Sequence, residues 1–170
     1  MELIKSFSLL LLLTVLPVNG QGKLLDVLPL IDSKVAYKNV KEAPLKLKMN
    51  LLANIQVWYK TENIETIHDK PLDDTHHLIS GIYRFKVLWG PNDFKELQKL
   101  IECQLELTLK NERYQYVISN FIVKEPDQVS QLEIYKMDHK KLQKYNKAFY
   151  ERIDQEINRL ILNLDASILR

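Results

Sequence analysis

Hydrophobic and polar residues alternate most regularly along residues 101–123. In the first part of this stretch, apolar residues occupy every second position: Ile101, Cys103, Leu105, Leu107 and Leu109. A period of two is typical of a β-strand with one dry face and one wet face. After Asn111 and Glu112 the chain continues with β-prone residues as far as Val123. We therefore predict one antiparallel β-hairpin whose apolar face is covered by the rest of the chain.

A two-residue turn at Asn111 and Glu112 would fix the register of this hairpin. It pairs three residues of each strand on the dry face: Leu109 with Tyr114, Leu107 with Tyr116, and Leu105 with Ile118. If this register continued without interruption, Asn120 would face inward and Phe121 outward. A β-bulge near Ser119 reverses both positions, so we predict a bulge there.

Two segments show the spacing of three and four residues that is typical of amphipathic helices. Residues 45–59 follow Pro44, which suits a first helical turn, and carry the stripe Leu51, Leu52, Ile55, Trp58 and Tyr59. A longer helix is predicted at about residues 138–168. Its stripe consists of Leu142, Tyr145, Phe149, Ile153, Ile157, Leu160, Leu164 and Ile168.

Shorter patterned segments complete the predicted order of elements. We predict strands at residues 35–40, 64–68 and 76–89, a helical turn at 94–100 and an extended lead-in at 22–33. Gly81 indicates a bulge or a close approach of another backbone. The predicted fold class is α+β: an antiparallel sheet of about five strands with two helices packed on one face, in the order strand, helix, strands, helix.

The first 20 residues have the pattern of a secretory signal peptide. Lys5 supplies the positive charge, Leu9 to Val15 form a short apolar core, and Gly20 is the small residue before Gln21. The apolar run is shorter than the ~20 residues that span a membrane. We therefore expect residues 21–170 to form a single exported domain, periplasmic or extracellular, without a transmembrane segment.

The composition limits the classes of function. Of the 170 residues, 46% are hydrophobic and 27% charged, and the net charge is only +2. A nucleic-acid-binding protein would be expected to carry a basic stripe, so nucleic acid is not an expected partner. Cys103 is the only cysteine, which excludes an intramolecular disulfide, and its place on the dry face indicates a small buried side chain.

Several segments match the pattern of a known family. They are Leu28-Pro29 with Val35-Ala36-Tyr37, Val57-Trp58, Lys110-Asn111-Glu112-Arg113-Tyr114 and Ile118-Ser119-Asn120-Phe121. Over about residues 26–123 they resemble an exported bacterial family of unknown function that is described as having a TATA-box-binding-protein-like fold. The resemblance implies one strand, helix, strands, helix unit, with the last helix as an extension, and it implies no catalytic residue.

Candidate chemistry is sparse. Histidines and aspartates cluster in one stretch, as His68, Asp73, Asp74, His76 and His77. Imidazole with carboxylate suits a divalent metal, and a hairpin would bring His68 near His76 or His77. However, no established metal-binding spacing is present, and a solvated turn has the same composition. We expect no catalytic residue, metal or other cofactor, and keep His68, Asp74 and His76 as the metal candidates.

Three hypotheses for the function follow. The first is a non-enzymatic binding or interaction domain of the cell envelope, which predicts an exposed apolar strip or a homodimer. The second is a carrier of a lipid or small apolar ligand, with a cavity between the sheet and the long helix. The third is a metal-dependent hydrolase built on His68, Asp74 and His76. Carboxylate pairs among Glu102, Glu106 and Glu112 would suit acid–base catalysis only within a cleft.

Overall fold

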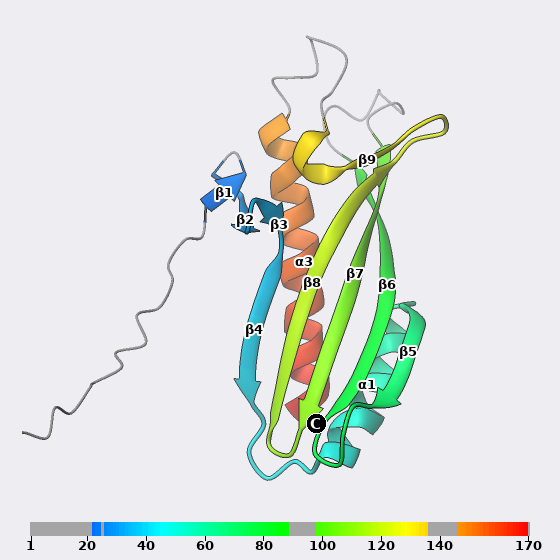
Figure 1. Ribbon diagram of the computed structural model, residues 1–170. Helices are drawn as coiled ribbons and strands as arrows, with labels where there is room; N and C mark the ends of the chain where they lie inside the picture. The colour runs from blue at the N-terminus through cyan, green and yellow to red at the C-terminus, as the bar shows by residue number, and fades with distance from the viewer. Residues whose placement is uncertain (1–21, 25, 89–97, 136–145, 170) are drawn as a thin grey trace, which may run out of the picture.

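The main feature of the computed structural model is an antiparallel sheet with both described α-helices behind it (Figure 1). The structure describes residues 22–24, 26–88, 98–135 and 146–169. The sheet has six strands in the order β4-β8-β7-β6-β5, with β9 also paired to β8. Its strands are β4 (Tyr37–Glu42), β5 (Glu65–Pro71), β6 (His77–Leu88), β7 (Gln98–Lys110), β8 (Arg113–Lys124) and β9 (Val129–Gln131).

This arrangement confirms the predicted α+β class and the packing of two helices on one face. The helices are α1 (Lys48–Thr61) and α3 (Asn146–Leu169), and a short 3₁₀ helix, η2, spans Leu132–Ile134. The sheet has one strand more than the five expected, because β9 was not predicted. Three further strands form a separate small sheet: β1 (Gly22–Leu24), β2 (Leu28–Ile31) and β3 (Lys34–Val35).

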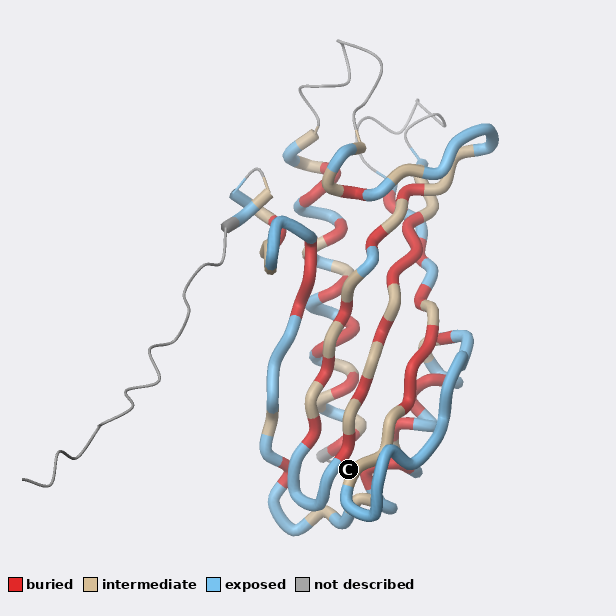
Figure 2. Tube along the Cα trace, in the orientation of Figure 1, coloured by how far each residue is buried: buried red, intermediate tan, exposed pale blue. Residues whose placement is uncertain are grey.

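The predicted central hairpin is confirmed as β7 and β8. The register pairs Leu109 with Tyr114, Leu107 with Tyr116 and Leu105 with Ile118, as the two-residue turn required. Each of these residues is buried, and the residues between them are partly exposed. Figure 2 shows this alternation of buried and partly exposed positions along β7 and β8.

The predicted bulge is also present. The register places Glu102 opposite Ile122 and Gln104 opposite Ser119, so β8 has one residue more than β7 at this point. Asn120 takes up the difference with a φ of 54°. As a result Phe121 is buried and Asn120 is exposed, which keeps the dry face continuous beyond the bulge.

The turn of the hairpin is held by the segment before α1. Glu112 has a φ of 59°, a conformation that is unfavourable for a side chain larger than glycine. Its backbone N–H donates to the Lys46 carbonyl at 2.8 Å, and its carbonyl accepts from the Ala43 N–H at 2.8 Å. These two hydrogen bonds fix the turn and set where α1 starts.

α3 covers the dry face along its length. Six residues of its predicted stripe are at most 1% exposed: Phe149, Ile153, Ile157, Leu160, Leu164 and Ile168. Leu142 and Tyr145 of the same stripe lie outside the described residues, as does the predicted helix start at 138–145. Burying a side chain of this size stabilises the fold by about 1.5–3 kcal/mol, so this helix is a major source of stability.

α1 buries the stripe that was predicted for it, but it begins later than predicted. Leu51, Leu52, Ile55, Trp58 and Tyr59 are its buried residues. The helix starts at Lys48 rather than at Pro44, because Leu45 has a φ of 65° and the backbone turns there.

Gly81 confirms the prediction of a close backbone approach. A Cβ atom at this position would lie 2.6 Å from the Glu65 carbonyl oxygen and 2.8 Å from both Ile64 and Tyr59. The register irregularity lies on the facing strand, between Thr66 and His68 of β5. The absence of a side chain at Gly81 thus lets α1 and the start of β5 pack directly against β6.

The remaining sequence predictions need small corrections. The strand at 35–40 is divided into β3 and β4, the strand at 64–68 extends to Pro71, and the lead-in at 22–33 forms β1 and β2. The helical turn at 94–100 is wrong at its end, because β7 already begins at Gln98. Its first part, 94–97, and Trp89 lie outside the described residues.

The contact at Gly81 predicts a large effect of one methyl group. Gly81→Ala should lower the free energy of unfolding by about 2–3 kcal/mol, because the added Cβ meets backbone as well as side chains. Urea unfolding measures this change. Thr66→Val, an isosteric change at the exposed residue opposite Gly81, should alter it by less than about 0.5 kcal/mol. Equal effects of the two substitutions would contradict the packing role of Gly81.

Candidate functional site

The predicted metal candidates lie around the β5–β6 turn, where Asp73 organises the loop. Its carboxylate accepts hydrogen bonds from the backbone N–H groups of Thr75 and His76, both at 2.7 Å. It also lies 2.9 Å from the His76 ring nitrogen. The bonds from Thr75 and then those from His76 hold the pKa of Asp73 well below its usual range. This is the arrangement of an aspartate that caps a turn.

The other candidates do not converge on it. His68 lies opposite Ser80 in the register, so the hairpin does not bring it beside His76 or His77 as expected. His77 instead contacts Asp69 at 2.6 Å, and the Asp74 carbonyl accepts from Lys48. Within the described residues, no three histidine, cysteine, aspartate or glutamate side chains are grouped as metal ligands. The geometry therefore does not support a hydrolase built on His68, Asp74 and His76.

The glutamates of the hairpin occupy three different settings. Glu102 lies on the open face of the sheet between Arg84 and Lys124, each 2.6 Å away. Glu106 accepts from Gln104 at 2.8 Å, and Glu112 is in the turn. Glu102 and Glu106 are four residues apart on one strand, which separates their backbones by about 13 Å. Glu102 is held by Arg84 and Lys124, whereas Glu106 is held by Gln104, so the two carboxylates have separate partners rather than acting as a pair.

The charges around Glu102 indicate that its role is structural. Burial raises its pKa, but hydrogen bonds from Lys124 and Arg84 outweigh burial and leave the pKa below its ordinary value. Arg84 also contacts Glu65 at 2.6 Å. The result is a four-membered ion cluster across the open face. Cys103 on the opposite face is 1% exposed, and burial raises its pKa, so it is an inert core side chain.

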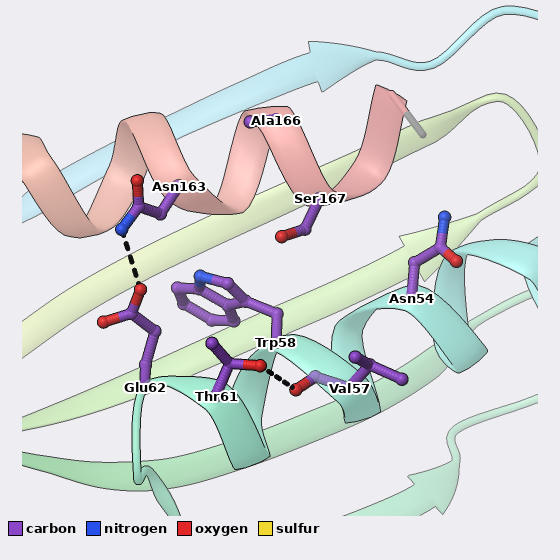
Figure 3. Close-up of a pocket in the computed structure, with 8 residues that line it drawn as sticks. All are labelled: Asn54, Val57, Trp58, Thr61, Glu62, Asn163, Ala166 and Ser167. Atoms are coloured by element: carbon purple, nitrogen blue, oxygen red, sulfur yellow. Dashed lines mark hydrogen bonds between the residues drawn. The ribbon is translucent and has the colours of Figure 1, made fainter.

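A groove lies between the two helices (Figure 3). This interhelix groove has a volume of about 330 Å³. Its lining residues come from α1 and its C-terminal cap and from the last turns of α3: Asn54, Val57, Trp58, Thr61, Glu62, Asn163, Ala166 and Ser167. Val57 is 64% exposed, so part of the wall is apolar and open to solvent.

Trp58 is the unusual residue of the interhelix groove. Its ring is 2% exposed and packs edge-on against Tyr59, with the centroids 5.6 Å apart. The indole lies between the helices with its nitrogen on the side of α3 (Figure 3). That nitrogen, Nε1, is buried and has no hydrogen-bond acceptor among the residues that the structure describes. Leaving a buried donor unpaired costs about 1–3 kcal/mol, and such groups are rare in folded proteins.

Glu62 forms the end of the interhelix groove and joins the two helices. It caps the C-terminus of α1, where the helix dipole disfavours a negative charge. Its carboxylate accepts from Asn163 Nδ2 at 2.8 Å and contacts Arg159 Nη2 at 3.0 Å. These donors from α3 offset the unfavourable position of the charge. The same contacts fix the distance between the helices and hence the width of the groove.

Arg159 continues this network towards the sheet. Its Nη2 contacts Glu156 at 2.7 Å and the Tyr83 hydroxyl at 2.9 Å, and that hydroxyl donates to Glu156 at 2.5 Å. Burial raises the pKa of Glu156, but hydrogen bonds from Arg159 and Tyr83 outweigh burial and lower it overall. The guanidinium of Arg159 is therefore engaged by Glu62, Glu156 and Tyr83.

The sequence identified Trp58 only as a core residue and gave no signal for the interhelix groove. Glu62 and Arg159 are 97 residues apart, and no local pattern links two such distant positions. The carrier hypothesis places its cavity in a different part of the fold, between the sheet and the long helix. Phe149, which is fully buried, packs in that layer.

Comparisons with known proteins agree on the fold. A DUF4468 family protein from Bacteroides ovatus is similar to this chain with a TM-score of 0.64 and 11% identity, over 83% of this chain and 90% of that one. A TBP-like protein from Parabacteroides distasonis gives a TM-score of 0.63 and 16% identity, over 82% and 96%. No protein-family model and no curated protein matches the chain.

These likenesses confirm the TATA-box-binding-protein-like fold that the sequence indicated. At such identities they show the fold alone, and a shared fold does not carry a function with it. Among the described helices, none is both long enough and apolar enough to cross a membrane.

The link between the helices predicts the effect of removing Arg159. Arg159→Met leaves Glu62, whose side chain is 10% exposed, without its cation and should lower the free energy of unfolding by about 1–3 kcal/mol. Urea unfolding at pH 7 measures the change. Arg152→Met, on the same helix and with Gln155 as its one partner in the described part of the chain, is the control and should cost less than about 0.5 kcal/mol. The two helices would not depend on Arg159 if both variants behaved alike.

The ion cluster at Glu102 predicts a dependence of stability on pH. Because its pKa is lowered in the folded chain, the folded state binds fewer protons than the unfolded state below the unfolded pKa of about 4.3. The stabilisation is complete above that pH and is lost as the pH falls through the folded value. Unfolding free energies measured from pH 6 to pH 3 should fall less steeply for Glu102→Gln than for the unmodified chain. Identical slopes would show that Glu102 does not contribute.

Proposed function

We propose that this protein is an exported, non-catalytic binding domain of the cell envelope that holds a ligand in the interhelix groove. The observation that carries the proposal is the buried, unpaired Nε1 of Trp58 at that groove. Because Nε1 is fully enclosed, a ligand oxygen would reach this donor only with a shift of the side chains that line the groove, and it would then satisfy a donor that is otherwise desolvated without compensation. Binding would thus offset the free-energy cost of the unpaired donor.

The walls of the interhelix groove define the chemistry of the ligand. Val57 and Ala166 supply an apolar surface, while Asn54 and Ser167 add polar groups. The carboxylate of Glu62 already accepts from Arg159, which it shares with Glu156, and from Asn163, so no cation is required of the ligand. We therefore propose a small, mainly apolar molecule that carries a carbonyl or hydroxyl oxygen. A volume of about 330 Å³ is at the lower end of the usual range for small-molecule sites.

This proposal changes the carrier hypothesis rather than repeating it. The ligand is placed between α1 and α3 instead of between the sheet and α3, where bulky core residues pack. We assign no role in catalysis because Glu102, Glu106 and the described histidines do not converge on one site. Nucleic acid is a poor partner for the open sheet face, because the carboxylate of Glu102 lies at the centre of its ion cluster.

Export rests on the amino-terminal sequence. Lys5, the apolar run from Leu9 to Val15 and the small residue Gly20 are the features that support a signal peptide covering residues 1–20. The mature chain would then begin at Gln21 and act as one domain in the periplasm or outside the cell. These first residues lie outside those the structure describes.

Native mass spectrometry of the chain purified from an exported fraction, without added ligand, tests the proposal. We expect a polypeptide mass that begins at Gln21 and an excess mass that denaturation releases as a small organic molecule. Ser167→Phe fills the interhelix groove and should abolish the excess. Leu162→Phe, at a residue that is 67% exposed and outside the groove, should retain it.

The indole N–H resonance of Trp58 gives a second measurement. It should differ between the protein as purified and the same protein after the ligand is removed, and Trp58→Phe identifies the signal. A bare chain, monomeric or dimeric, would contradict the interhelix groove as a ligand site. A bound metal in its place would favour the hydrolase.

A further inference from the structure

The half of β6 nearest its C-terminus presents an unpaired edge. β5 pairs with β6 only from His77 to Ile82, whereas β7 pairs with β6 along its full length to Leu88. In the described parts of the chain, no strand adjoins Tyr83–Leu88 on the side away from β7 (Figure 1). The backbone groups on that side are therefore available to another strand.

The other edges of the sheet carry features that block pairing. On β4, the Asn39 side chain accepts the Val40 N–H at 2.8 Å and so occupies an edge donor. β5 contains the irregularity between Thr66 and His68 and ends at Pro71. β9 is only three residues long. Irregularities, prolines, short strands and charged side chains are the means by which proteins protect edges. Of these, the free half of β6 has only the charges of Arg84 and Lys86, which disfavour a cationic partner but not an acidic one.

A groove backs this free edge. It has a volume of about 360 Å³ and lies between the end of β6 and α3. We call it the edge groove, and its lining residues are Lys86, Val87, Leu88, Arg152, Gln155, Glu156 and Arg159. A strand added to β6 would point alternate side chains into the edge groove and onto the open face of the sheet. Leu88, which is 53% exposed, offers an apolar contact beside it.

The charges at this edge favour an acidic partner. Lys86 has no hydrogen-bond or ion-pair partner among the described residues, and Arg152 donates only to the neutral Gln155, at 3.1 Å. Arg159, by contrast, is occupied by Glu62, Glu156 and Tyr83. The two uncompensated cations lie on the strand and on the helix that flank the edge. An extended segment with carboxylates would meet one of them on each of its faces.

We infer that the free edge Tyr83–Leu88 of β6 binds an extended acidic segment of another protein by adding a strand to the sheet. Main-chain hydrogen bonds to β6 supply the affinity, and Lys86 and Arg152 supply the preference for acidic side chains. This inference does not depend on the interhelix groove, because none of the residues that carry it lines that groove.

A second copy of this chain fits the edge less well. Antiparallel pairing of Tyr83–Leu88 with itself about Phe85 would place Arg84 opposite Lys86 of the partner. Pairing about Lys86 would place that lysine opposite its own copy. Like charges directly opposite one another destabilise a sheet. In these two registers the edge therefore fits an acidic segment from a different chain better than a second copy of this one.

A peptide of seven residues with alternating aspartate and valine is a suitable probe. Its binding to the protein is measured by the fluorescence anisotropy of a label on the peptide. We expect Lys86→Glu with Arg152→Glu to raise the Kd at least tenfold, because both cationic contacts become repulsive. Lys38→Glu with Lys110→Glu makes the same change in net charge at exposed residues away from this edge and should leave the Kd within twofold. Ser167→Phe should also leave it unchanged.

Two control peptides separate strand addition from attraction by charge. The same peptide methylated at every backbone nitrogen keeps its carboxylates but cannot donate to β6, and it should not bind. A peptide in which lysine replaces aspartate should bind at least tenfold more weakly. On binding of the acidic peptide, amide hydrogen exchange should slow at residues 83–88.

Several outcomes would overturn the inference. Equal binding of the methylated peptide would show a charged patch rather than a strand site. Equal binding of the lysine peptide, or an unchanged Kd in the Lys86 and Arg152 double variant, would remove the acidic specificity. No binding to the unmodified protein would exclude this class of partner. Near-ultraviolet circular dichroism of each variant shows that the fold is retained.

Discussion

The structure depends on the coverage of the dry face of the β7–β8 hairpin by α3. The hairpin presents an unbroken apolar surface because the bulge at Asn120 returns Phe121 to the buried side. α3 presents a matching stripe from Phe149 to Ile168. Neither surface is stable in water without the other, since an exposed hairpin face of this size has no compensation for its ordering entropy. The remaining elements extend this two-layer core rather than forming another.

The unequal lengths of the two helices explain where the binding surfaces lie. α1 has 14 residues and spans about 21 Å, whereas α3 has 24 residues and spans about 36 Å. The β6 strand, with 12 residues, extends for about 40 Å. α1 and β5 can therefore accompany only one half of β6. Where both helices are present, the interhelix groove forms between them. Where α3 is alone, the edge of β6 stays open with the edge groove behind it.

The sequence was sufficient for the parts of the fold that depend on neighbours in the chain. Alternation predicted the hairpin register, and helical spacing predicted every buried residue of α1. The sequence was insufficient where contacts between distant residues determine the structure. The backbone turn at Leu45 delays α1, and the β5–β6 connection, which pairs Pro71 with His77, leaves His68 opposite Ser80 instead of near the other histidines. β9 is too short to show a period. The interhelix groove depends on the contact between Glu62 and Arg159 and contains the unpaired Nε1 of Trp58. Neither feature produces a pattern among neighbouring residues in the sequence.

The similar structures share this fold at 11% and 16% identity, which indicates that a two-layer core of this kind tolerates almost complete replacement of its sequence. What distinguishes this chain must then lie in groups that the core does not require. Trp58 Nε1 is such a group, because a phenylalanine ring would fill much of the same space without an unpaired donor. Lys86 and Arg152 are others, because neither has an acidic partner in the described residues. Arg159 lies between the two surfaces and is occupied by Glu62, Glu156 and Tyr83. Its charge is therefore used to hold the helices together. It is not available to a ligand in the interhelix groove or to an acidic strand at the edge groove.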